Sequence, residues 1–303
     1  MKYMPILILL TICLALPGFA SHSSHSLIVR GKGSFVFQND SLNYGRPITI
    51  LTYRPGSYNA ESPILFVMHG NSRTAENYRD VWVDVAEENN ALLLVPHFSR
   101  ENGFPESSHY NLGNMFKFGD DDELLSANPE SDWSYSLIDP IFDFVVGKMG
   151  NKSKAYFIYG HSAGSQFVHR FLFFKPHSKV LKAVCANAGW YTMPDLNVEF
   201  PYGLGGTNYS PAKLSRFLER DIIILLGDKD VDTNHRSLRR TPQAMKQGPH
   251  RYARGRNFFG ICGLKAQSLG IPFSWKLQEV PGAAHSNAAM APAAGKLLFG
   301  NNN

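Results

Sequence analysis

The sequence has few cysteines and no recognisable set of metal ligands. Three cysteines occur among 303 residues, and Cys13 lies in an apolar N-terminal run. For Cys185 and Cys262 two interpretations stay open. They form a disulfide, which export would permit, or they are buried thiols, because Cys185 lies in an apolar segment. No H-x-x-x-H pattern and no cluster of Cys and His is present, which argues against a metal enzyme.

Long hydrophobic runs are absent beyond the N-terminus, so no later segment is expected to span a membrane. The apolar run at residues 6–16 has the length of a signal-peptide core. Lys2 precedes it, and small residues precede a cleavage point after Ala20. We expect a signal peptide at residues 1–20, a secreted or periplasmic protein, and no stable membrane insertion after cleavage. An uncleaved anchor helix is the alternative interpretation.

The net charge of the chain is only mildly positive, and we expect no nucleic-acid partner. The chain has 30 Lys and Arg residues against 25 Asp and Glu residues, a net charge of +5. Acidic residues are, however, missing from residues 233–278. The basic residues of that segment are Arg236, Arg239, Arg240, Lys246, Arg251, Arg254, Arg256, Lys265 and Lys276. The segment either attracts an anionic substrate, polymer or surface, or pairs internally with acidic stretches such as 120–123. We favour the second, because charge runs are usually solvated or paired.

Apolar strands and amphipathic helices alternate along the rest of the chain. Continuous apolar runs are typical of strands buried on both faces. The expected strands are residues 47–53, 63–68, 91–96, 154–159, 180–186, 221–226 and 273–280. The expected helices are residues 75–90, 132–149, 164–175 and 286–299. The pattern predicts an α/β fold with a mostly parallel central sheet and helices on both faces.

We expect this fold to form a single domain at residues 47–303, preceded by an N-terminal lead at residues 21–46. Residues 97–130 lack clear periodicity. Loops of this length in compact domains are usually functional or mobile.

The segment Gly160-His161-Ser162-Ala163-Gly164 follows one expected strand and precedes a helix. The pattern G-x-S-x-G alone is also compatible with an ordinary turn. In parallel sheets, functional groups collect beyond the carboxyl ends of the strands. If Ser162 is a nucleophile, its partners should therefore follow later strands.

Asp230 and His285 meet this condition, because Asp230 follows the strand at 221–226 and His285 follows the strand at 273–280. The order Ser162, Asp230, His285 resembles that of the α/β-hydrolase superfamily over residues 47–299. Asp228 and Asp232 remain candidates for the acid, although the spacing G-x-x-D favours Asp230.

The resemblance implies a role for each residue. Ser162 would be the nucleophile, His285 its general base, and Asp230 the group that orients the imidazole. A tetrahedral intermediate also needs hydrogen-bond donors for its oxyanion. We expect these to be the backbone N–H groups of Ala163 and of Asn71, which follows a His-Gly turn after the strand at 63–68.

The stretch HGNSRTAENY at residues 69–78 is similar to secreted esterases of the polyhydroxyalkanoate depolymerase and feruloyl esterase group. This similarity implies a carboxylesterase that acts on a small-molecule or polymeric ester through an acyl-enzyme, without a cofactor. A serine peptidase of the same fold and a non-catalytic binding protein are the alternatives. Trp190 and Tyr191 follow the strand at 180–186 and are expected either to contact substrate or to pack at the rim.

Overall fold

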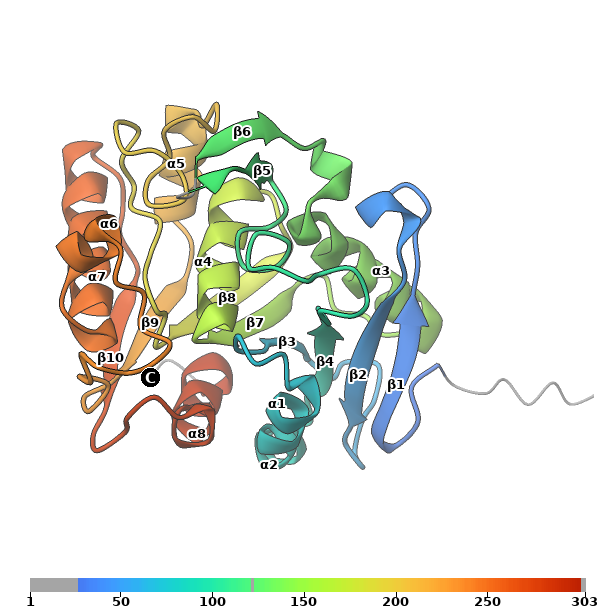
Figure 1. Cartoon of the computed structure of the whole chain (residues 1–303). Coiled ribbons are helices and arrows are strands. Elements are labelled where there is room, and N and C mark those ends of the chain that lie inside the picture. The colour runs from blue at the N-terminus through green and yellow to red at the C-terminus, as the bar shows by residue number, and fades with distance from the viewer. Residues whose placement is uncertain (1–26, 121–122, 301–303) are drawn as a thin grey trace, which may run out of the picture.

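The computed structural model describes residues 27–120 and 123–300. Its centre is an eight-stranded sheet in the order β1-β2-β4-β3-β7-β8-β9-β10 (Figure 1). The strands are β1 (Gly31–Phe37), β2 (Ile48–Arg54), β3 (Ile64–Met68), β4 (Leu92–His97), β7 (Tyr156–His161), β8 (Val180–Ala186), β9 (Ile222–Gly227) and β10 (Lys276–Val280). The pairs β1–β2 and β2–β4 are antiparallel, and the pairs from β4 to β10 are parallel. The predicted α/β fold with a mostly parallel sheet is confirmed.

Helices cover both faces of this sheet. Strand β3 shows why: Ile64, Phe66 and Met68 belong to one core cluster, and Leu65 and Val67 belong to the other. Successive side chains of a strand point to opposite faces, so a continuous apolar run needs a cover on each side. The first face carries α3 (Ile138–Met149), α4 (Ala163–Phe174), α5 (Pro211–Leu218) and α7 (Arg251–Ser268). The second carries α1 (Ala75–Val81), α2 (Val83–Glu88) and α8 (Asn287–Phe299) (Figure 1).

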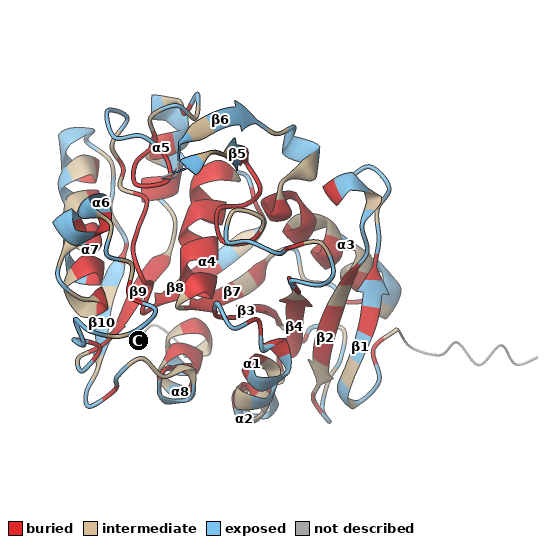
Figure 2. Ribbon diagram, viewed as in Figure 1, coloured by how far each residue is buried: buried red, intermediate tan, exposed pale blue. Residues whose placement is uncertain are grey.

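Helix α4 lies at the centre of the larger cluster. Every one of its 12 residues is buried, and Figure 2 shows it as an almost continuous buried ribbon between the sheet and the segments above it. The helix begins directly after Ser162. The dense packing around α4 therefore fixes the position of Ser162.

The expectation of an N-terminal lead at 21–46, outside the domain, is wrong for residues 31–37. Residues 31–37 form β1, which pairs with β2 along its whole length, from Gly31 opposite Arg54 to Phe37 opposite Ile48. Lys32, Ser34 and Val36 are the exposed positions of this edge strand, and two of the alternate positions are glycines, so the segment lacks the apolar run by which the inner strands were identified. The described part of the domain thus begins before Pro47. The expected signal peptide at 1–20 lies outside the described residues.

The segment 97–130 contains little regular structure, as predicted. A short hairpin forms within it from β5 (Phe116–Phe118) and β6 (Leu124–Ala127). The expected helix at 75–90 is divided into α1 and α2 at Trp82. Short 3-10 turns, η3 (Glu130–Asp132) and η4 (Ser134–Leu137), precede α3, and a further helix, α6 (Pro242–Gln247), precedes α7.

Cys185 and Cys262 are both buried and unpaired, so of the two interpretations the thiols are the one observed. Within residues 27–120 and 123–300, no helix combines the length and the apolar character that crossing a membrane requires.

Candidate active site

Ser162 sits at a strained turn between β7 and α4. Its backbone angles are φ 58° and ψ −118°, a region that non-glycine residues seldom occupy. A Cβ at Gly160 would collide with the carbonyl group of Gly164, and a Cβ at Gly164 would collide with the carbonyl oxygen of Met68. The two glycines are therefore required by close backbone packing on either side of the serine.

Ser162, His285 and Asp230 form a continuous hydrogen-bonded chain. The Oγ atom of Ser162 lies 2.9 Å from Nε2 of His285, and Nδ1 of His285 lies 2.7 Å from Oδ2 of Asp230. The three residues follow β7, β10 and β9, whose carboxyl ends meet at one edge of the sheet. Asp230 is 3% exposed, so the carboxylate is screened from water.

The two neighbouring aspartates do not reach His285. Asp228 accepts a hydrogen bond from the backbone of Gly282 at 2.7 Å, and Asp232 accepts one from the backbone of Asn234 at 2.8 Å. Both therefore shape turns, and Asp230 is the member of the trio that contacts the imidazole.

A buried arginine, Arg251, forms an ion pair with the second carboxylate oxygen of Asp230. Nη1 of Arg251 lies 3.3 Å from Oδ1, and Nη2 lies 2.9 Å from Ser237 Oγ and 3.1 Å from His235 Nδ1. Arg251 is 1% exposed. From the sequence, Arg251 was assigned only to the basic segment. It lies 21 positions after Asp230, and no sequence pattern indicates that the two residues are in contact.

The two expected oxyanion donors flank Ser162. Asn71 and Ala163 line the same cavity as the serine, and within the described part of the chain no hydrogen bond uses either backbone N–H. The carbonyl group of Asn71 accepts a hydrogen bond from Arg100 at 3.3 Å, which ties this loop to the segment after β4. The loop is thus held at the edge of the sheet beside Ser162.

Two buried histidines near the site are structural in their contacts. His69 accepts a hydrogen bond at Nε2 from the backbone of Phe98 at 3.1 Å, and burial, with a further contribution from Arg73, lowers its pKa to about 3. His161 is hydrogen-bonded at Nδ1 to Tyr78 at 3.0 Å, and burial lowers its pKa well below the usual range. Both imidazoles are therefore neutral near pH 7.

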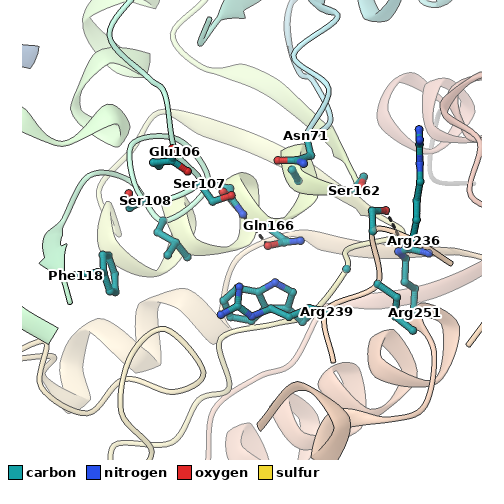
Figure 3. Close-up of a pocket in the computed structure, with 17 residues that line it drawn as sticks. Asn71, Glu106, Ser107, Ser108, Phe118, Ser162, Gln166, Arg236, Arg239 and Arg251 are labelled. Atoms are coloured by element: carbon teal, nitrogen blue, oxygen red, sulfur yellow. Dashed lines mark hydrogen bonds between the residues drawn. The ribbon is translucent and has the colours of Figure 1, made fainter. Parts of the chain in front are cut away.

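A cavity of about 590 Å³ opens beside Ser162 (Figure 3). Its walls come from Asn71 after β3, the loop 106–112 with Phe118, the residues that follow β7 and β8, and the segment 236–239 with Arg251. Residues 97–130 therefore contribute part of the cavity wall.

The structure separates the two expected substrate contacts. Trp190 lines the cavity, and two guanidinium groups lie over its ring, with Cζ of Arg170 4.1 Å and Cζ of Arg239 5.1 Å from the ring centroid. Tyr191 is wholly buried and stacks on Phe258 at 4.4 Å. The expectation that Tyr191 contacts substrate or packs at the rim is wrong, because the chain turns inward after Trp190.

The basic segment 233–278 is divided between buried and cavity-lining arginines. Arg254 is fully buried and donates to the carbonyl oxygens of Gly248, Gly189 and Arg239 at 2.7–2.9 Å. Arg256 pairs with Glu279. Internal pairing occurs, as favoured, but no ion pair within residues 27–120 and 123–300 joins the segment to Asp120 or Glu123. Arg236, Arg239 and Arg251 line the cavity.

Comparisons with known proteins agree with this architecture. No protein-family model and no curated protein sequence matches the chain. Among solved structures, poly(aspartic acid) hydrolase-1 from Sphingomonas sp. KT-1 is 42% identical with a TM-score of 0.85, and the match covers 90% of this chain and 100% of that one. LpqC, a poly(3-hydroxybutyrate) depolymerase from Bordetella parapertussis, is 34% identical with a TM-score of 0.84, covering 91% and 92%.

A more distant solved structure shares the same fold. FphF, a fluorophosphonate-binding serine hydrolase from Staphylococcus aureus, is 15% identical with a TM-score of 0.55 over 88% of this chain and 97% of that one, which shows a shared fold alone. The resemblance to the α/β-hydrolase superfamily is confirmed by the two similar structures at higher identity. The chain belongs to the α/β-hydrolase family that includes poly(aspartic acid) hydrolase-1 and LpqC, and it is a serine hydrolase.

Proposed function

We propose that the protein is a secreted carboxylic ester hydrolase that uses Ser162, His285 and Asp230 as its catalytic residues. The observation that carries the proposal is the hydrogen-bonded chain at 2.9 and 2.7 Å that ends on a buried carboxylate. Serine is a weak nucleophile unless a base lies within hydrogen-bond reach, and His285 meets that distance.

In this mechanism Ser162 Oγ attacks the scissile carbonyl carbon while His285 Nε2 takes the hydroxyl proton. Asp230 holds the proton on Nδ1 and stabilises the imidazolium. His285 then gives its proton to the leaving group, which leaves an acyl-enzyme on Ser162. Water, deprotonated by the same imidazole, releases the acid and restores the serine. No cofactor is required.

The backbone N–H groups of Asn71 and Ala163 would bind the oxyanion of both tetrahedral intermediates. Ala163 is the first residue of α4, so its N–H is one of those that the helix itself cannot pair. The partial positive charge at the helix N-terminus adds to this stabilisation.

Replacement of Ser162 tests the mechanism. Ser162→Ala is expected to fold normally and to lose at least about 10³-fold in kcat on 4-nitrophenyl esters. A fluorophosphonate probe should label the unmodified protein and fail to label the variant. Ser268→Ala, at an exposed serine on α7, is the matched control and should keep both properties. Retained esterase activity in Ser162→Ala would refute the proposal.

An amide in an anionic polymer is the second candidate substrate, and a specific observation favours it. Poly(aspartic acid) hydrolase-1 is 42% identical to this chain, and Arg236, Arg239 and Arg251 line the cavity beside Ser162. An acyl-enzyme mechanism serves esters and amides alike. Parallel assays on poly(3-hydroxybutyrate), poly(aspartic acid), short 4-nitrophenyl esters and aminoacyl anilides distinguish the ester hydrolase, the polyamide hydrolase and the peptidase.

We propose secretion because residues 1–20 have the pattern of a signal peptide, and this proposal is tested separately. Expression of the full chain in a Gram-negative host should give a mature protein in the periplasm or medium that begins at Ser21, as read by N-terminal sequencing. A cytoplasmic product that keeps Met1 would contradict it.

A further inference from the structure

Gln166 lies in the first turn of α4, four residues after Ser162. Its backbone N–H donates to the carbonyl oxygen of Ser162 at 3.1 Å, and both residues line the same cavity. Gln166 lines the cavity and is 7% exposed. In Figure 3 its side chain points into the cavity between Asn71 and Arg239.

The orientation of the Gln166 amide follows from its neighbours. Nη1 of Arg170 lies 3.3 Å from one amide atom of Gln166, and Nδ2 of Asn111 lies 2.7 Å from the same atom. A guanidinium group can only donate hydrogen bonds, so the atom that it faces must be the oxygen Oε1. With Oε1 held by two donors, the Nε2 group must point the other way.

The Nε2 group faces the open side of the site. None of the described residues accepts a hydrogen bond from it. Gly189 adjoins it, and a Cβ at that position would lie 2.8 Å from Nε2. A glycine at 189 therefore leaves room for the amide, and Gly189 itself lines the cavity. The cavity wall thus holds an oriented donor with no acceptor among the described residues.

We propose that Gln166 Nε2 donates a hydrogen bond to a second acceptor oxygen on the acyl part of the substrate, beyond the scissile carbonyl. This inference rests on the proposed function of Ser162. We assign this contact to the acyl part because the leaving group must face His285, which gives it a proton. The acyl part then extends away from His285, toward Gln166. In the view of Figure 3, Gln166 and Arg251, which contacts Asp230 on the His285 side, lie to either side of Ser162. The substrate class is an acyl group with a further ester, amide or carboxylate carbonyl, as repeating polymer units have.

The test exchanges the donor for an acceptor without changing the shape of the side chain. In Gln166→Glu, Arg170 and Asn111 still donate to one carboxylate oxygen, and the other oxygen replaces Nε2. Two substrates of equal chain length separate the effects: methyl 4-nitrophenyl succinate carries the second carbonyl, and 4-nitrophenyl hexanoate lacks it. The ratio of their kcat/KM values is expected to fall on the order of tenfold or more in the variant, because a donor is lost and an acceptor opposes the carbonyl.

Two further variants keep the test decisive. Gly189→Ala pushes the amide away from its position, so the same ratio should fall again. Gln243→Glu makes the same charge change on the exposed surface of α6 and should leave the ratio unaltered. Equal losses on both esters, in variants that a fluorophosphonate still labels at Ser162, would overturn the inference and leave the proposed function intact. Activity that survives in Ser162→Ala would instead overturn the proposed function.

Discussion

Four arginines of the segment 233–278 lie in two different environments. Arg251 and Arg254 are at most 1% exposed and have fixed partners in a carboxylate and three backbone carbonyls. Arg236 and Arg239 lie on the cavity wall. We refer to the first pair as the buried arginines and to the second as the wall arginines. Guanidinium groups that are taken out of water need partners within the protein, whereas an exposed guanidinium such as that of Arg236 can exchange water for substrate.

Arg254 gives the largest expected effect on stability. Replacement by Leu removes the donor of three buried carbonyl oxygens, and Arg254→Leu should lower the free energy of unfolding by about 3 kcal/mol. Arg256→Gln, at an exposed pair with Glu279, should lower it by less than about 1 kcal/mol. Urea denaturation followed by circular dichroism measures both. Similar losses in the two variants would remove the distinction between buried and exposed arginines in this segment.

The difference between these environments explains how much the sequence could predict. The ends of parallel strands meet at one edge, so Ser162, Asp230 and His285 were predicted from apolar runs and chain order, and the structure brings them together. The contact of Arg251 with Asp230 depends on how α7 packs against β9, which no local pattern records. Residue 191 shows the same limit, because it turns inward while its neighbour Trp190 faces the cavity.

One wall residue could have been found from the sequence. Gln166 lies in the first turn of the helix expected at 164–175, directly after Ser162, so its place close to the serine follows from the sequence. The edge strand β1 could not be found in the same way, because its outward Lys and Ser and its two glycines give no apolar run. Periodicity therefore predicts which residues share an element, and tertiary packing decides which of them meet across elements.

The buried histidines predict a loss of stability in acid. The pKa of His69 is about 3 in the fold because of burial, against an ordinary 6.5 in the unfolded chain. The unfolded state therefore binds a proton as pH falls below 6.5 while the folded state does not, and stability is lost from that pH downward. Between pH 7.5 and pH 5 the contribution of His69 should fall by about 2 kcal/mol. Urea denaturation at both pH values should show a smaller pH dependence for His69→Gln than for the unmodified protein. An unchanged dependence would contradict the prediction.

Arg251 connects the buried arginines to catalysis. Its guanidinium donates to Oδ1 of Asp230 and to Oγ of Ser237, so it holds in place the carboxylate that orients His285. Arg251→Gln should therefore lower kcat on 4-nitrophenyl butyrate by about tenfold, because a carboxylate with one fixed partner fewer holds the imidazole less firmly in position. Arg251→Lys, which keeps the charge, should restore part of the rate. An unchanged kcat in Arg251→Gln would contradict a contribution of Arg251 to the position of Asp230.

The wall arginines give the smallest expected effect and the one that bears on substrate. Arg236 makes no ion pair with a described residue, and Arg239 donates to the hydroxyl group of Tyr202 at 2.6 Å while its guanidinium lies over Trp190. Arg236→Gln should therefore reduce kcat/KM for 4-nitrophenyl hemisuccinate by about twofold to fivefold relative to 4-nitrophenyl butyrate, because an exposed charge contributes up to about 1 kcal/mol.

Salt separates this attraction from a change of cavity shape. If Arg236 acts through its charge, the selectivity of the unmodified protein for the anionic ester should decline between 20 and 500 mM NaCl toward that of Arg236→Gln, since screening removes the same interaction that the substitution removes. Arg240→Gln, at a neighbouring exposed arginine that donates to backbone carbonyls and does not line the cavity, serves as the matched control. Equal effects of Arg236→Gln on the two esters, or the same loss in Arg240→Gln, would show that the basic segment makes no specific contribution to substrate charge. A selective, salt-sensitive loss would assign the anionic preference to Arg236, whereas the buried arginines stabilise the fold and hold Asp230.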